Sequence, residues 1–212
     1  ALNNFVYAGP DRFLCVNLGA GGQFTQSAST LSFGGVFKNT VRQTVNTGTT
    51  AFTATNIWIG ISQAIEGFNS YDLVGFPTAL SFIFNTNLTG TYSVSLRDST
   101  DSQSYVNSFS AVANTPVKVT IVIPPIPSGA AVPRANTQGL KVAVGYQNQG
   151  DFQTATLGVW QAASKSTAAG ATTWAATAGN FIELTELQLE LGSTATAFER
   201  RSYGLELALC QR

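Results

Sequence analysis

The stretch Phe181–Leu191, FIELTELQLEL, indicates the fold most directly. Apolar side chains recur at every second position in each half of it, which is the period of a strand that buries one face. The two halves are out of phase, and the phase changes near Thr185–Glu186. One β-bulge there would return all five apolar side chains to one core face. Leucine and glutamate also favour helices, but the clean alternation in Leu187–Leu191 favours a strand. The five apolar residues are Ile182, Leu184, Leu187, Leu189 and Leu191.

The same alternation recurs along the whole chain. It is clear in Thr91–Arg97 and in Val117–Ile123, where Pro124 and Pro125 then end the strand because proline cannot donate to a ladder. Ten or more short strands separated by turns predict an all-β protein, an antiparallel two-sheet jelly-roll sandwich. The other strand candidates are Phe13–Leu18, Gln23–Ser27, Val41–Val45, Asn56–Ile65, Ala79–Phe84, Ser104–Val112, Gly139–Tyr146 and Ala155–Trp160.

The length of 212 residues predicts a single domain over residues 1–212. No linker and no internal repeat divides the chain. We expect residues 179–212 to supply a closing strand and a short C-terminal tail, with a helical turn at Tyr203–Cys210. Lys165–Thr173 is small and polar, and we expect it to be a surface loop.

The composition excludes several classes of function. Charged residues make up 10% of the chain, against about 25% in an average globular protein. Eleven basic and eleven acidic residues cancel, so no basic field favours nucleic acid. The chain has no histidine, which removes imidazole catalysis and histidine metal sites. No apolar run is long enough for membrane insertion. We therefore expect no catalytic residue, no metal site and no cofactor.

The densest acidic cluster lies near the C-terminus and consists of Glu183, Glu186, Glu190 and Glu199. On a strand, Glu186 and Glu190 would share a face about 13 Å apart. Glycosidases need two carboxyl groups about 5–9.5 Å apart. We interpret these glutamates as solvent-facing strand residues, with Glu190 or Glu199 in a salt bridge.

Two further motifs leave alternatives open. Asp98–Asp101 offers closely spaced oxygen atoms but lacks the glycine and the bidentate glutamate of a calcium loop, so hydrogen bonds that form a turn are the main interpretation. Cys15 and Cys210 lie near opposite ends of the chain. They are expected to be buried free thiols, although a bridge is possible where the two ends of a jelly roll meet.

Aromatic side chains are candidates for carbohydrate binding, because exposed rings can stack on sugars. The candidates are Trp160, at the end of a predicted strand, Trp174, after the small-residue loop, and Tyr146 and Tyr105, near turns or in half-polar segments. Tyr71 and Phe152 lie in segments of the same kind. The alternative for each ring is ordinary β-core. Similarly, Phe33, Val36 and Phe37 form either an assembly surface or core.

The C-terminal segment Gly179–Arg212, GNFIELTELQLELGSTATAFERRSYGLELALCQR, closely resembles the C-terminal signature of phage structural and tail-fibre proteins. Weaker matches are Asp11–Phe13, Gln63–Glu66 and Thr78–Phe82. Ala197 departs from the pattern, which usually has proline there. The matching residues of the signature are Gln188, Leu189, Glu190, Gly192, Thr196, Phe198, Glu199, Arg201, Glu206, Leu207, Cys210, Gln211 and Arg212.

This resemblance implies a jelly roll related to carbohydrate-binding modules, carried on virions and often trimeric. It implies a non-enzymatic virion protein, either a tail-fibre or short-fibre subunit or a capsid decoration, that assembles in the host cytoplasm. Its implied partners are two further copies in a homotrimer, other virion proteins and a host-surface glycan. The alternatives are a lectin-like carbohydrate-binding module and a glycan-degrading spike.

Overall fold

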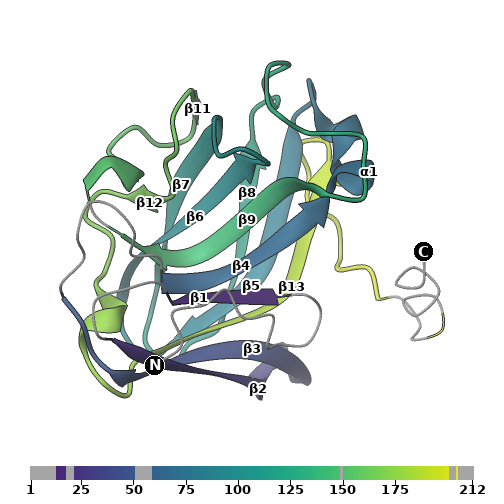
Figure 1. Cartoon of the computed structure of the whole chain (residues 1–212). Coiled ribbons are helices and arrows are strands. Elements are labelled where there is room, and N and C mark those ends of the chain that lie inside the picture. Colours follow the sequence, from purple (N-terminus) through teal and green to yellow (C-terminus); the bar gives the residue numbers. More distant parts are fainter. Residues whose placement is uncertain (1–12, 18–21, 51–58, 149, 201–203, 205–212) are drawn as a thin grey trace.

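The computed structural model describes residues 13–17, 22–50, 59–148, 150–200 and 204. Two antiparallel sheets face each other across one core, which confirms the predicted jelly-roll sandwich (Figure 1). Sheet A has the order β1 (Phe13–Asn17), β4 (Ile59–Glu66), β9 (Gln138–Gln147), β6 (Gly90–Asp98), β7 (Ser104–Ala111) and β11 (Trp160–Gln161). Sheet B has the order β2 (Gln23–Phe33), β3 (Val36–Thr47), β13 (Phe181–Leu191), β5 (Thr78–Thr86) and β8 (Val117–Ile123).

Short elements connect and cover the two sheets. A small parallel pair, β10 (Gln153–Thr154) and β12 (Thr167–Ala168), lies against sheet A. The helical turns are α1 (Gly67–Ser70), η2 (Tyr71–Leu73), η3 (Gly150–Phe152) and η4 (Trp174–Ala176). No helix among the described residues is long and apolar enough to cross a membrane.

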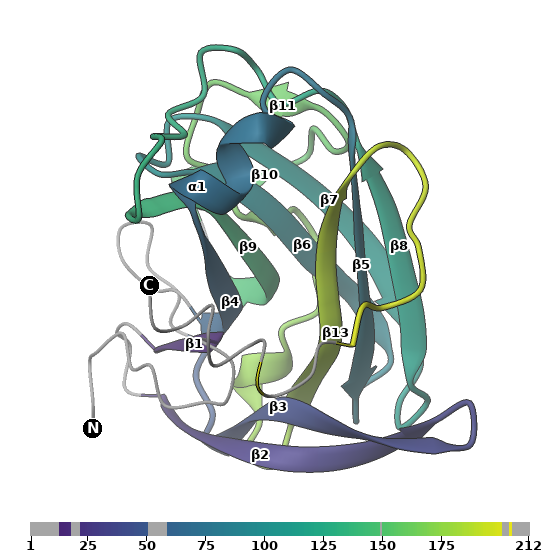
Figure 2. The same cartoon turned by 90° about the vertical axis from the view of Figure 1, so that its right-hand side faces the viewer.

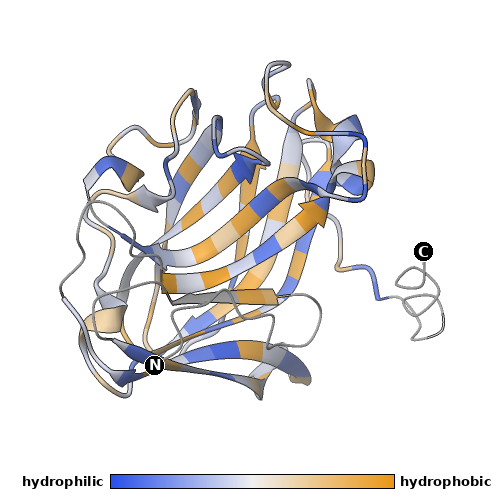
Figure 3. Cartoon of the chain, in the orientation of Figure 1, coloured by the Kyte–Doolittle hydropathy of each residue, from blue (hydrophilic) through white to orange (hydrophobic). Residues whose placement is uncertain are grey.

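The core consists of the side chains that the two sheets turn toward each other, and hydropathy alternates along the strands as the sequence indicated (Figure 3). Four aromatic rings from both sheets form its centre. Phe84 lies 4.9 Å from Tyr92 and 5.0 Å from Phe109 between ring centroids, and Phe82 lies 5.3 Å from Phe109. Tilted and edge-to-face contacts of this kind stabilise a core beyond simple burial.

The predicted bulge in β13 is confirmed. Thr185 lies opposite Ile83 and Gln188 opposite Ser81, so β13 has one residue more than β5 between the two pairs. The extra residue is accommodated at Glu186, whose φ is 52°. The strand lies between β3 and β5, in the middle of sheet B.

The bulge restores most of the apolar residues of β13 to the core side. Ile182 and Leu184 are buried, and Leu187 and Leu189 pack against the core. The prediction was wrong for Leu191, which is exposed because it is the last residue of the strand.

Strands β2 and β3 are much longer than their predicted parts, Gln23–Ser27 and Val41–Val45. They form one hairpin that turns at Gly34 and Gly35, whose φ values are 60° and 76°. Two consecutive left-handed residues are the requirement of a type I′ turn, which glycine meets without strain. The alternation here is between small polar side chains, so hydropathy alone does not show the strand.

Two sequence-based expectations need correction. The candidate strand Ala155–Trp160 is absent; two-residue strands lie on either side of a turn instead. Lys165–Thr173 is not a surface loop throughout, since residues 166–168 are buried. They pack on the outer face of sheet A, where the backbone N–H of Ala168 donates to Oγ of Ser93 at 2.9 Å. Small side chains on both surfaces allow this close approach.

The expected helical turn at Tyr203–Cys210 lies outside the described residues, apart from Gly204. Cys210 and the side chain of Cys15 lie outside them as well, and with them the predicted free thiols and the alternative of a bridge.

Candidate functional site

Three of the four aromatic candidates are buried. Trp174 is 1% exposed, and Tyr105 and Tyr146 are each 2% exposed. Nε1 of Trp174 donates to the carbonyl oxygen of Gly145 at 2.8 Å. A ring without an exposed face cannot stack on a sugar, so the binding role predicted for Tyr105, Tyr146 and Trp174 is wrong in this geometry. The core alternative holds for all three.

Trp160, the fourth candidate, is partly buried at the edge of sheet A. Its Nε1 donates to the carbonyl oxygen of Pro124 at 3.0 Å, and its ring tilts against Tyr105 with centroids 6.0 Å apart. Both contacts hold the ring against the sandwich. The structure therefore does not bring the four candidates together as one exposed platform.

The interpretation of the acidic cluster as solvent-facing is wrong for Glu183. It is fully buried on the outer side of β13 and accepts hydrogen bonds from Nε of Arg42 at 2.6 Å and from Nδ2 of Asn85 at 2.8 Å. Glu186 pairs instead with Nζ of Lys38 at 2.5 Å and with Nη2 of Arg200 at 3.1 Å. Glu183 therefore links β13 to β3 and β5, and Glu186 links β13 to β3 and to the chain that follows β13.

Glu190 and Gln188 hold the chain that follows β13, an arrangement we call the clasp. Glu190 accepts the backbone N–H of Thr196 at 3.0 Å, and Gln188 accepts the backbone N–H of Glu199 at 2.8 Å. Burial would raise the pKa of Glu190, but hydrogen bonds from Thr196 and Gln188 and the nearby Lys118 hold it below its ordinary value. These residues belong to the C-terminal signature, and the clasp gives them a structural role.

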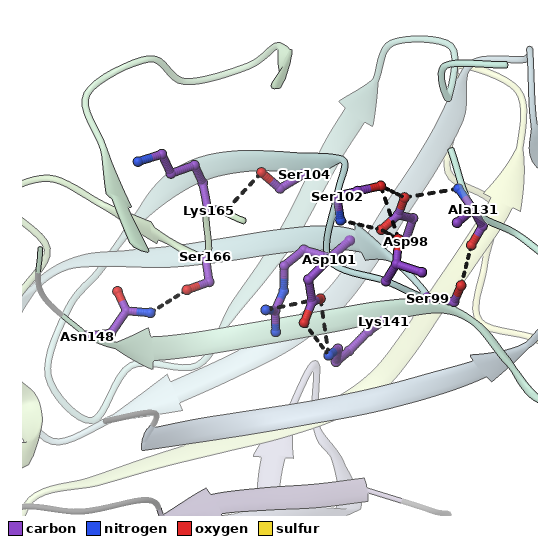
Figure 4. Close-up of polar contacts among 12 residues, drawn as sticks. Asp98, Ser99, Asp101, Ser102, Ser104, Ala131, Lys141, Asn148, Lys165 and Ser166 are labelled. Carbon is purple, nitrogen blue, oxygen red and sulfur yellow. Dashed lines mark hydrogen bonds and ion pairs between the residues drawn. The ribbon is translucent and has the colours of Figure 1, made fainter. Parts of the chain in front are cut away.

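Asp98 organises the turn between β6 and β7 (Figure 4). Its carboxylate accepts hydrogen bonds from the backbone N–H of Ser102 at 2.8 Å, from Oγ of Ser102 at 2.7 Å and from the backbone N–H of Ala131 at 3.0 Å. Burial would raise the pKa of Asp98, but these hydrogen bonds hold it below its ordinary value. The turn-forming interpretation is confirmed, since both carboxylate oxygens are used within the protein.

Arg97, Lys141 and Asp101 form a charged group beside this turn. Asp101 lies 3.2 Å from Nη1 of Arg97 and 3.2 Å from Nζ of Lys141. Burial lowers the pKa of Arg97, and the carboxylate of Asp101 opposes that shift. Burial and the neighbouring Arg97 likewise lower the pKa of Lys141. The group is partnered internally and links β6 to β9.

An open site lies elsewhere, at the end of the sandwich where α1 and η2 connect β4 to β5 (Figure 1). The backbone N–H of Gly67 donates to Thr137 at 2.8 Å, and that of Phe68 donates to Ala135 at 3.0 Å. A Cβ at Gly67 would stand 1.8 Å from the carbonyl oxygen of Pro133. Glycine is therefore needed for α1 to dock this closely, and the docking fixes the residues that follow.

The docked segment turns two aromatic rings outward. Phe68 and Tyr71 are three residues apart, which places them on one side of a helical turn, and they are 60% and 39% exposed. Together with Asp72 and Arg134 they line a hollow of about 280 Å³, which we call the aromatic hollow. The guanidinium of Arg134 lies 4.2 Å from the centroid of Tyr71, and its Nη2 lies 3.5 Å from Oδ1 of Asp72.

The sequence alone does not predict the aromatic hollow, although Tyr71 lies near a turn in a half-polar segment. Its signal is present in Gly67–Asp72, GFNSYD, where two aromatic residues occur in a polar segment between two strands. Rings in such a segment have no strand face on which to be buried. Arg134 approaches from a distant part of the chain, and no local pattern shows that contact.

The sequence matches no protein-family model and no curated protein. Solved structures with a similar fold include a candidate sugar-binding protein from Bacteroides thetaiotaomicron, with a TM-score of 0.50 and 14% identity over 90% of this chain and 92% of that one. Two others come from Clostridium thermocellum. One is a family 22 carbohydrate-binding module of Xyn10B, with a TM-score of 0.46, 12% identity and coverage of 89% and 92%. The other is a family 11 module, with a TM-score of 0.42, 11% identity and coverage of 91% and 94%. At such identities the similarity to the first structure shows the jelly-roll fold.

Proposed function

We propose that this protein is a non-catalytic glycan-binding module and that it binds sugar in the aromatic hollow. The observation that carries the proposal is the open face of Phe68 beside Arg134 and Asp72. Exposed apolar surface rimmed by polar groups is typical of ligand-binding grooves, and a few polar groups beside apolar lining fix a ligand's orientation. The jelly-roll fold supports the proposal, since the similar structure from B. thetaiotaomicron is described as a candidate sugar-binding protein.

The chemistry of the hollow suits a sugar ring. One face of a pyranose consists of C–H groups and packs on an aromatic ring, while its hydroxyl groups need hydrogen-bond partners. Arg134 covers Tyr71, so Phe68 is the ring left open for stacking. Arg134 supplies donors and Asp72 supplies acceptors. The volume of about 280 Å³ is slightly below the roughly 300–1,000 Å³ of typical ligand pockets, so we propose a single terminal sugar residue as the ligand.

A glycan-degrading activity has no support in this hollow. Glycoside hydrolysis uses two carboxyl groups on either side of the scissile bond. Of the described residues that line the hollow, Asp72 alone carries a carboxyl group. We therefore infer binding without cleavage.

We further propose that the module is displayed on a phage virion, as a tail-fibre, short-fibre or capsid decoration subunit that attaches to the host surface. The resemblance of Gly179–Arg212 to the phage signature supports this. In the structure, four residues of that signature, Gln188, Glu190, Thr196 and Glu199, contact one another in the clasp. Gold-labelled antibodies against the chain should decorate intact particles; particles that never bind the antibody would count against virion display.

Glycan binding can be tested on an array of bacterial surface glycans, using the full chain and two matched variants. Phe68→Ala removes the stacking ring and should weaken binding about three- to tenfold, since such contacts contribute about 0.5–1.5 kcal/mol. Phe76→Ala removes an equally exposed ring on the same connection, outside the hollow. It should bind like the wild type.

Two results would overturn the proposal. One is a folded wild-type chain that binds no glycan on the array. The other is equal loss of binding in Phe68→Ala and Phe76→Ala, which would place the ligand elsewhere on this connection.

A further inference from the structure

The two edge strands of sheet B, β2 and β8, differ in the features that discourage pairing with a strand of another chain. β8 carries the exposed Lys118 and is followed by Pro124 and Pro125. Charged side chains and prolines at an edge discourage pairing with another strand. The edge strands of sheet A are short instead, with five residues in β1 and two in β11. Short edges also offer little for another chain to pair with.

β2 has none of these protections. It runs for eleven residues and, in the part of the chain that the structure describes, pairs with β3 alone. No lysine, arginine, aspartate, glutamate or proline occurs from Phe13 to Phe37. Every second residue of an antiparallel edge strand turns its N–H and C=O away from its neighbour. β2 therefore presents a long, uncharged row of backbone donors and acceptors.

In the described residues, the far half of the β2–β3 hairpin has no third strand in its ladder, although the side chains of Thr185 and Glu186 on β13 reach Asn39 and Lys38. β13 pairs with β3 over Val41–Thr44, and the bulge then ends the ladder. Figure 2 shows the hairpin running along the bottom of the sandwich to its turn. Beside the turn, Val36 is 50% exposed and Phe37 is 79% exposed. A two-stranded ribbon on its own is marginally stable in water, so added contacts would stabilise this part.

We propose that β2 pairs antiparallel with β2 of a second copy of this chain, across a two-fold axis centred on Ala28. The charge pattern favours a second copy as the occupant. Self-pairing places each residue opposite one from the same strand, and charges of one sign would then repel. β2 contains only neutral side chains, so identical strands meet without that cost.

The pairing also covers the exposed apolar tip. With Ala28 opposite its counterpart, Ser32 lies opposite Phe24 of the second copy. Phe37 pairs with Ser32 in the hairpin and shares its face. That Phe24 packs against Trp174 of its own copy and is partly exposed, and the small Ser32 leaves room for Phe37 to approach its open side. The two-fold pairing differs from the trimer that the phage resemblance implies, and it does not depend on the aromatic hollow.

The test is the molar mass of the full chain by light scattering after size-exclusion chromatography. The wild type should be a dimer. Ala28→Lys places two cations opposite each other at an exposed position and should give a folded monomer. Thr120→Lys adds the same charge to an exposed position of β8 and should remain a dimer.

Charge reversal makes the test specific to the register. Ala28→Glu alone should also be monomeric, and an equimolar mixture with Ala28→Lys should restore the dimer mass. A wild-type monomer, or a wild-type oligomer that Ala28→Lys leaves intact, would overturn the proposal. So would two monomeric variants that fail to associate on mixing. Molar mass needs no ligand, so these outcomes are independent of glycan binding.

Discussion

Two regions of this protein contain the same three kinds of side chain and use them differently. In each, an arginine lies over a tyrosine ring and beside an aspartate. The buried group consists of Arg97, Tyr146 and the partly exposed Asp101, and the exposed group consists of Arg134, Tyr71 and Asp72. The Arg97 side chain is 1% exposed, whereas those of Arg134 and Asp72 are 67% and 86% exposed.

The difference lies in what satisfies the charges. In the buried group the cation has been removed from water, so its partners within the protein must replace the lost hydration. In the exposed group, water hydrates the charges, and the ion pair itself contributes little to stability. The exposed side chains are therefore available to exchange water for the hydroxyl groups of a ligand. The same three kinds of side chain therefore stabilise the fold in one place and, under the proposed function, would bind sugar in the other.

The largest expected difference between the two groups is in how much each arginine contributes to the free energy of unfolding. Arg97→Ala removes a buried cation and its packing, and should lower the free energy of unfolding by about 3–5 kcal/mol. Arg134→Ala should lower it by less than about 1 kcal/mol. Urea denaturation of both variants measures the contrast. Equal losses would show that burial does not separate the two groups.

The carboxylate next to the buried group should make stability depend on pH. The pKa of Asp98 is lowered in the folded protein, so its contribution is present above the unfolded value of about 3.9 and is lost as pH falls through the folded value. Asp98→Asn should cost about 2 kcal/mol at pH 7. It should also lose less stability than the wild type on acidification below about pH 4.

Thermal melting of the wild type and of Asp98→Asn from pH 7 to pH 3 tests whether the ionised carboxylate stabilises the fold. Parallel curves for the wild type and Asp98→Asn would contradict the stabilising role of the ionised carboxylate. Glu190 also has a lowered pKa, so part of the acid sensitivity should remain in Asp98→Asn.

Arg134→Ala, the variant expected to change stability least, should nevertheless change glycan affinity. Arg134→Ala should weaken the affinity for the glycan found on the array about tenfold, because a hydrogen bond from a charged group contributes about 1.5 kcal/mol. Isothermal titration at constant pH and salt measures it. Unchanged affinity would remove Arg134 from the site and leave Phe68 as its main contact.

The sequence predicted the parts of the fold that follow from local alternation. Val117–Ile123 is a strand with the predicted bounds, and the phase change in Phe181–Leu191 correctly located a bulge. Alternation fails where both alternating sets are small and polar, as in the far half of β2. It also failed for residues 166–168, whose burial depends on the small side chains of sheet A beneath them.

The residues of the proposed binding site were harder to predict because exposure is a property of the whole fold. Trp174 and Tyr146 lie near turns in the sequence, but their rings are covered by other parts of the chain. Phe68 and Arg134 meet only because Gly67 lets α1 dock on the segment before β9. Nothing within either local sequence indicates that contact.

The central claim is that the exposed group and Phe68 form the sugar site. A crystal structure of the protein with its glycan tests this most directly. It should show a sugar ring packed on Phe68, with hydroxyl groups hydrogen-bonded to Arg134 or Asp72. A sugar bound against Trp160 or on a face of either sheet, with the hollow occupied by water, would contradict the claim.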